Sequence, residues 1–139
     1  MTSSASRSFR PGPAVAWLWA PVVAYMALIF FVSSLSQPPT PPVVTFTQAH
    51  TLGYLGLAVV VARALSGGLP PRLRWTTAVA TIAICAAYAV TDECHQFFVP
   101  GRSFETGDLV ADTVGASIGT VLSWAWGIIA PPSSSRGSL

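Results

Sequence analysis

The residues best suited to acid–base chemistry or ion binding are few in this chain, and they are grouped. All five acids fall between residues 92 and 112: they are Asp92, Glu93, Glu105, Asp108 and Asp112. His50 lies earlier, near the start of an apolar segment. Clustered carboxylates can share a proton, act as acid and base, or bind a divalent cation. His50 would be the remaining general base in such a site.

Helical spacing places several of these side chains on common faces. Asp92 and Gln96 are four residues apart, as are Asp108 and Asp112, so each pair lies on one face of a helix. Glu93 is turned away from the face of Asp92 and Gln96. We therefore expect two polar faces, one near the end of the third apolar segment and one at the start of the fourth.

Each of these side chains also has a purely structural interpretation. Asp108 could stabilise the start of the last helix through the helix dipole. Asp92 and Glu93 could mark the boundary between lipid and water, and His50 could be a hydrogen-bonded core residue. The sequence leaves these alternatives open.

Arg102 lies on the short connection between the two polar faces, directly after Pro100-Gly101. Its guanidinium can hold a carboxylate or phosphate with two parallel hydrogen bonds. An ion pair with Asp112 would be a structural use of both residues. Pro100-Gly101 is most simply a turn that reverses the chain.

The elements that must position these residues are apolar helices. Only 9% of the 139 residues are charged and 52% are hydrophobic, whereas soluble domains carry about 25% charge. Four apolar segments, residues 14–35, 43–65, 75–98 and 107–130, are each long enough to cross a bilayer as a helix. The sequence therefore predicts an all-α, integral membrane four-helix bundle over residues 14–130. Tails at 1–13 and 131–139 flank it, and we expect the second to be disordered.

The arginines predict the orientation of this bundle. Six of the seven precede the first segment, flank the second connection or follow the last segment: Arg7, Arg10, Arg63, Arg72, Arg74 and Arg136. By the positive-inside rule these positions are cytoplasmic, so both termini are predicted to lie inside a bacterial plasma membrane. The polar residues then meet at the extracytoplasmic face.

Gly115 and Gly119 form a GxxxG spacing in the last segment. Such a stripe lacks side chains and lets another helix approach closely. Close packing within the four-helix unit is the favoured interpretation, and a homodimer is the alternative.

Two polar motifs resemble the signature of the VanZ-like membrane protein family. The first is His50-x-x-x-Tyr54-x-x-Leu57, and the second runs from Asp92-Glu93-x-x-Gln96 through Pro100-Gly101-Arg102-Ser103 to Asp108, Asp112, Gly115 and Gly119. The resemblance implies a small multipass bacterial membrane protein, related to one that gives low-level resistance to the glycopeptide teicoplanin. It adds Tyr54 to the candidate pocket. Relatives commonly carry an Asp-Lys pair where this chain has Phe46-Thr47, so an activity that needs the pair would be lost or would depend on the last two helices.

Three functions remain in competition. The leading hypothesis is a binding or accessory protein whose outer polar pocket engages a membrane lipid or a lipid-linked envelope intermediate, with glycopeptide tolerance as a consequence. The second is an intramembrane enzyme acting on such a lipid, although no HExxH, GxSxG or phosphate-cradling loop is present. The third is a proton- or ion-coupled transporter. We expect no cofactor, no resident metal ion and no nucleic-acid partner.

Overall fold

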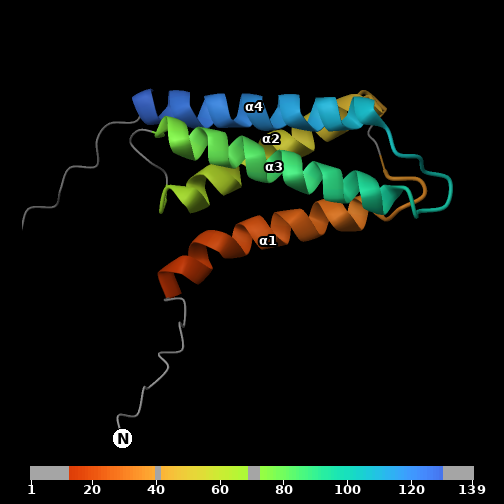
Figure 1. The fold of residues 1–139 in the computed structure, drawn as a ribbon, viewed down its shortest axis with the longest axis horizontal. Coiled ribbons are helices and arrows are strands. Elements are labelled where there is room, and N and C mark those ends of the chain that lie inside the picture. Colours follow the sequence, from red (N-terminus) through yellow and green to blue (C-terminus); the bar gives the residue numbers. More distant parts are fainter. Residues whose placement is uncertain (1–12, 40–41, 69–72, 130–139) are drawn as a thin grey trace, which may run out of the picture.

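The chain forms four α-helices. The structure is a computed structural model that describes residues 13–39, 42–68 and 73–129. The helices are α1 (Pro13–Ser33), α2 (Phe46–Leu65), α3 (Trp75–Gln96) and α4 (Thr106–Ile129), with no strand among the described residues (Figure 1). The predicted all-α fold is confirmed. The expected tails, 1–13 and 131–139, lie almost wholly outside the described residues, as do Arg7, Arg10, Arg72 and Arg136.

Local signals set the helix ends near the site. Thr45 caps α2 by accepting a hydrogen bond from the backbone N–H of Gln48, and the Gln48 side chain accepts from the N–H of Thr45. After α3, Gly101 has a φ of +81° and the N–H of Arg102 donates to the carbonyl of Val99 over 3.0 Å. Proline followed by a positive-φ glycine is typical of a type II turn. This turn places Arg102 between α3 and α4.

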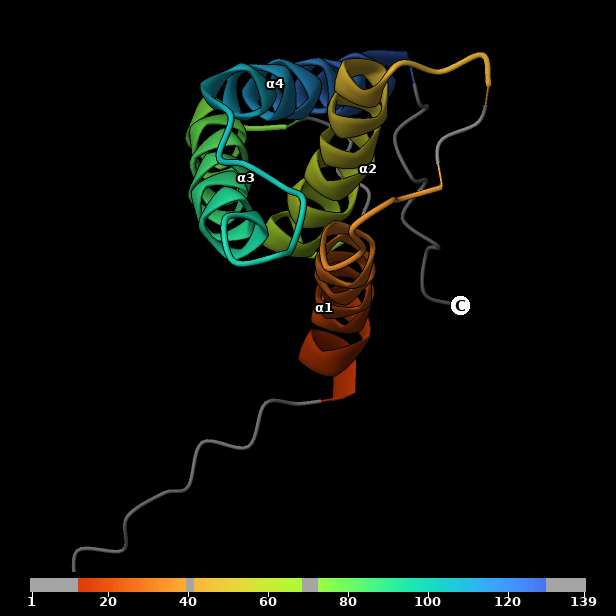
Figure 2. The same cartoon turned by 90° about the vertical axis from the view of Figure 1, so that its right-hand side faces the viewer.

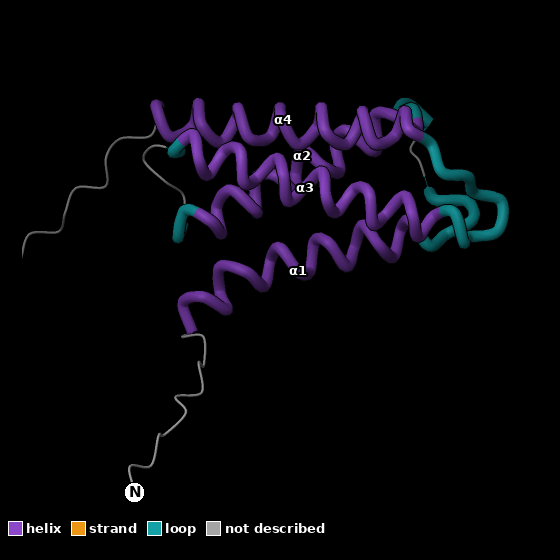
Figure 3. The backbone as a smooth tube through the Cα atoms, viewed as in Figure 1, coloured by secondary structure: helices purple, strands orange, loops and turns teal. Residues whose placement is uncertain are grey.

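Three of the helices form the body of the molecule, and α1 lies at its edge. α2, α3 and α4 all pack against one another, whereas α1 packs against α2 and α3 but not against α4 (Figure 2). The N-terminal part of α1 diverges from the other helices in Figure 1. The α1–α2 and α3–α4 connections lie at the same end of the molecule (Figure 3), so the end of α1, the start of α2, the end of α3 and the start of α4 meet there.

Glycines allow the closest helix contacts. A Cβ added at Gly115 would overlap the backbone carbonyl of Thr51, and one at Gly119 would overlap the carbonyl of Leu55. The GxxxG stripe of α4 therefore packs on α2 within the chain, and any homodimer must use another face. On the opposite side of α2, Gly56 makes room for the ring of Tyr25 on α1.

Polar residues lie inside the molecule and large apolar residues outside. All four helices carry exposed apolar side chains, among them Phe31, Leu52, Val79, Val114 and Ile118. Two helices, α1 over Val15–Ser33 and α3 over Trp75–Gln96, are long and apolar enough to cross a membrane. α2 and α4 contain His50 and Arg63, and Asp108 and Asp112, respectively, and are not among these candidates. The described residues thus contain two candidate membrane spans.

Candidate functional site

His50 lies at the centre of a buried polar cluster and contacts two acids of α4. Its Nδ1 atom is 3.0 Å from Oδ1 of Asp112, and its Nε2 atom is 3.7 Å from Oδ2 of Asp108. The two acids are one helical turn apart, so both face α2, where His50 follows the capped start of the helix. Asp112 is fully buried and Asp108 is 6% exposed. Asp108 is thus more than a residue that stabilises the helix start.

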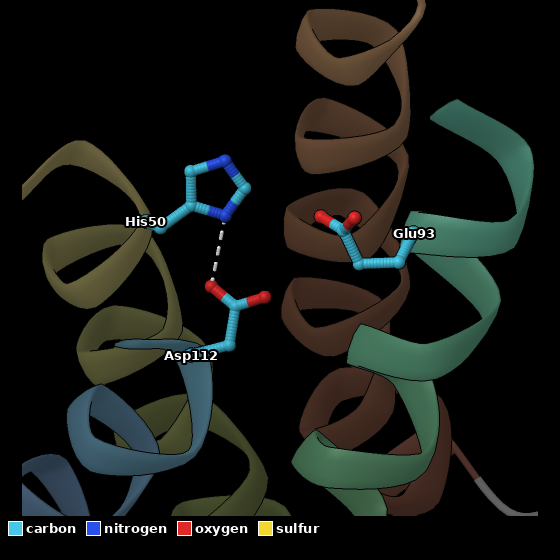
Figure 4. Close-up of side chains that lie close together, drawn as sticks. All are labelled: His50, Glu93 and Asp112. Carbon is cyan, nitrogen blue, oxygen red and sulfur yellow. Dashed lines mark hydrogen bonds and ion pairs between the residues drawn. The ribbon is translucent and has the colours of Figure 1, made fainter. Parts of the chain in front are cut away.

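Glu93 reaches the same cluster from α3. Figure 4 shows its carboxylate pointing toward His50 and Asp112 from the opposite side of the space between them. Its Oε2 atom accepts a 3.0 Å hydrogen bond from the backbone N–H of Glu105, and its Oε1 atom has no partner among the described residues. Glu93 is 0% exposed. Glu93 therefore does not mark a water boundary, because its side chain is fully buried and the backbone just before α4 donates a hydrogen bond to it.

Ligand atoms of His50, Glu93 and Asp112 all lie within 4.8 Å of one another. The second oxygen of Asp112, like that of Glu93, has no hydrogen-bond partner among the described residues. Side chains from α2, α3 and α4 therefore converge on one point, which spacing along the sequence cannot reveal.

A second polar network connects α3 to α1. Asp92 is 2% exposed, and its Oδ2 atom accepts hydrogen bonds from Ser33 Oγ (2.8 Å) and Gln96 Nε2 (3.2 Å). The guanidinium of Arg102 donates to Oε1 of Gln96. Asp92 and Gln96 share a face as expected, and both are buried, so Asp92 does not mark a water boundary either.

Arg102 does not form the ion pair with Asp112 that the sequence suggested. No carboxylate of the described residues lies within ion-pair distance of its guanidinium, and its Nη1 atom is buried without a partner. The guanidinium stacks over the ring of Phe46, 4.7 Å from its centroid. Phe46, one of the two departures from the family motif, thus supports Arg102 through a cation–π contact.

A cavity of about 210 Å³ lies beside the two polar networks, between α1 and α2. Apolar atoms of α1, including Leu28, Ile29 and Val32, form one wall, and Gly53 and Ala49 form part of the other. His50, Asp92, Arg102, Ser33 and Tyr54 also line this cavity. It therefore combines an apolar groove with polar groups from several helices. Asp112 contacts His50 but does not itself line the cavity.

Tyr54, one helical turn beyond His50, is buried and its hydroxyl has no hydrogen-bond partner among the described residues. Its ring lies 6.3 Å from that of Tyr88, centroid to centroid. Outside the cavity, His95 bonds to Ser34 over 2.9 Å and stacks on Phe30. His95 and Cys94, an exposed free cysteine, take no part in the cluster.

Sequence reasoning missed the contribution of α1 to the site. Ser33 is buried and donates to Asp92, and Tyr25 lines the cavity. The pair Ser33-Ser34 at the end of an apolar segment was the available signal, because a buried hydroxyl needs a hydrogen-bond partner. Nothing in the sequence indicated which face of α1 meets α2.

Comparison with known proteins supports the resemblance seen in the motifs. No curated protein and no solved structure matches the chain. A family model described as VanZ/LLP1 matches residues 15–127, which is more than half of the chain and reaches from α1 to α4. All the polar residues described above fall within the match, and the chain therefore belongs to the VanZ/LLP1 family.

Proposed function

We propose that this chain is a multipass protein of the bacterial plasma membrane that binds an envelope lipid in the cavity between α1 and α2. The lipid tail occupies the apolar groove and its anionic headgroup lies at Arg102. The termini are cytoplasmic and the polar end of the bundle faces outward, in keeping with the positive-inside rule.

The inverted distribution of polarity supports a membrane location. Four carboxylates are buried while large apolar residues are exposed on every helix. In water this arrangement would leave apolar surface unburied and would bury charge at a cost. In a bilayer, exposed apolar side chains contact lipid and intramembrane acids face the bundle interior.

The choice of ligand class rests on one observation. The apolar groove also includes Arg102, a cation that has no anionic partner within the described residues. A lipid tail fits the wall formed by α1, and the planar guanidinium suits a phosphate or carboxylate. Asp92 faces the same cavity, and its unpartnered Oδ1 atom would accept a hydrogen bond from a hydroxyl of a sugar headgroup. An envelope lipid carries all three features, and a change in its availability would alter tolerance to teicoplanin-type glycopeptides.

Gly53 offers a direct test, because it lines the cavity and a Cβ there would meet nothing within 4 Å. Gly53→Leu should fill the groove without displacing the helices. Native mass spectrometry of the detergent-purified protein should then show loss of co-purifying lipid, whereas Ala87→Leu, on an exposed face of α3, should retain it.

The polar end is tested by Arg102→Gln. We expect it to weaken binding of an anionic lipid about tenfold or more, since a charge-assisted pair contributes roughly 1.5–3 kcal/mol. Binding of a zwitterionic lipid should change less. Equal lipid content in wild type, Gly53→Leu and Arg102→Gln would refute the proposal.

The His50–Asp112 contact favours an intramembrane enzyme as the second candidate. A histidine oriented by a buried carboxylate, 3.0 Å away and beside a cavity, is the arrangement expected of a general base. This candidate predicts turnover of a radiolabelled polyprenyl-phosphate lipid by the purified protein, and Asp112→Asn should abolish that turnover. Lipid binding without turnover would exclude the enzyme and would leave lipid binding as the only one of the two functions.

A further inference from the structure

The buried cluster at the polar end contains more negative than positive groups. Four carboxylates lie there, each no more than 6% exposed: Asp92, Glu93, Asp108 and Asp112. Among the described residues, only His50 lies within ion-pair distance of any of the four, and Arg102 contacts Gln96 instead. Because isolated buried charge is expensive, the cluster needs a further cation or bound protons.

Three of these carboxylates, Asp92, Glu93 and Asp112, have a buried oxygen with no hydrogen-bond partner among the described residues, and two of the three lie beside His50. The unpartnered oxygens of these two are Glu93 Oε1 and Asp112 Oδ2. Both carboxylates face the space beside His50 (Figure 4). Unpartnered buried acceptors of this kind require an explanation, such as a bound ion.

We propose that His50, Glu93 and Asp112 bind a divalent transition-metal ion, for which Zn²⁺ and Mn²⁺ are the suitable probes. Their ligand atoms lie within 4.8 Å of one another. The 3.0 Å between His50 Nδ1 and Asp112 Oδ1 suits two ligands of one ion at about 2.1 Å each. A small shift of the Glu93 carboxylate completes the set.

The donor set determines the class of ion. One imidazole nitrogen with two carboxylates favours a transition metal over Mg²⁺ or Ca²⁺, which prefer oxygen ligands alone. Two carboxylates and a neutral imidazole also balance the charge of a divalent ion. Three protein ligands leave a coordination position for water or for a ligand atom.

Asp108 has the position of an outer partner of the metal-binding histidine. When Nδ1 binds the metal, Nε2 carries the proton, and Oδ2 of Asp108 lies 3.7 Å from Nε2. A carboxylate on the far nitrogen fixes the tautomer and orientation of a metal-bound imidazole. Asp108 is thus a positioning residue in this site, and removing its charge should weaken the metal site without removing a ligand.

The test uses tag-free full-length protein in mild detergent. Elemental analysis after purification without chelator should find about one divalent metal per chain. After chelator treatment, titration with Mn²⁺ followed by electron paramagnetic resonance should show one bound ion. We expect Glu93→Gln and Asp112→Asn each to weaken Mn²⁺ binding at least about tenfold, and Asp108→Asn to weaken it less.

Matched controls lie outside the cluster. His95→Gln removes the other histidine of the chain and Glu105→Gln an exposed acid, and both should bind Mn²⁺ as wild type does. Where a ligand variant fails to fold, Co²⁺ added to wild type should give the visible absorption of a nitrogen- and oxygen-ligated site, and His50→Gln should change it.

Two results would overturn the metal site. Wild type without detectable Mn²⁺, Zn²⁺ or Co²⁺ binding would mean that protons neutralise the cluster. Equal binding by wild type, Glu93→Gln and Asp112→Asn would place the metal elsewhere. The metal and lipid proposals can be refuted independently. Gly53→Leu should lose lipid while its Mn²⁺ affinity stays unchanged, and a Gly53→Leu variant that keeps its lipid would count against the lipid proposal alone.

Discussion

Asp92 shows how a single acid can link two helices. Its Oδ2 atom accepts hydrogen bonds from Ser33 on α1 and from Gln96 on α3, and Arg102 holds Gln96 from the other side. Hydrogen bonds to a charged group are stronger than those between neutral groups. At the residue scale, Ser33 is therefore the polar group by which the end of α1 is fixed to the site.

Ser33→Ala should destabilise the protein by about 1–3 kcal/mol, because it leaves a buried carboxylate oxygen with one partner fewer. Thermal unfolding in detergent measures the effect. The adjacent Ser34→Ala is the matched control: Ser34 is exposed, and its bond to His95 lies at the surface. A larger loss for Ser34→Ala than for Ser33→Ala would contradict the assigned role.

The sequence predicted which polar residues would gather but not how they would pair. Asp112 was considered a partner for Arg102, yet it contacts His50, while Arg102 contacts Gln96. The reason is geometric: helical spacing assigns a residue to a face, but the pairing depends on which faces pack together. Glu93 was expected to face away from Asp92, and it does: it lies in the cluster with His50 and Asp112, while Asp92 contacts Ser33 and Gln96.

At the scale of the helices, α4 is held to α2 by close backbone contact at two glycines. Gly115→Ala would place a methyl group against the carbonyl of Thr51, and a rigid backbone cannot move away as a side chain can. Overpacking typically costs about 1–3 kcal/mol. We expect a lower melting temperature in detergent and, since Asp112 is on the same helix, weaker Mn²⁺ binding.

Gly107→Ala is the control on the same helix. A Cβ at Gly107 would meet nothing within 4 Å, so the alanine should be neutral or stabilising, by up to about 1 kcal/mol. Similar effects from Gly107→Ala and Gly115→Ala would show that helix propensity, not the contact with α2, determines the change.

The positions of the helices could be predicted well, and their mutual packing could not. Apolar length and proline clusters placed all four helices within a few residues of their observed bounds. α2 begins at Phe46 and not at residue 43, because Thr45 and Gln48 form a capping box there. The cavity depends on which face of α1 meets α2. An almost uniformly apolar helix such as α1 carries no pattern that selects one face for packing.

At the scale of the whole molecule, the proposed lipid site requires an open side. α1 contacts α2 and α3 and leaves α4 untouched, and its polar attachments lie mostly toward its C-terminal end, at Ser33 and Ser34. The N-terminal part of α1 diverges from the bundle (Figure 1). A lipid tail could therefore enter from the bilayer between α1 and α2 while the headgroup stays at the polar end.

The α3–α4 connection gives a test of the membrane orientation. Glu105 is exposed on the α3–α4 connection, which should face outward if the arginine-rich ends are cytoplasmic. In a Cys94→Ser background, which removes the exposed native cysteine and leaves the buried Cys85, Glu105→Cys should react with an impermeant maleimide on intact cells. Ser66→Cys, at the opposite end of α2, should react only after permeabilisation. The reverse pattern would place His50, Glu93 and Asp112 at the cytoplasmic face, where an envelope lipid exposed only on the outer surface could not reach them.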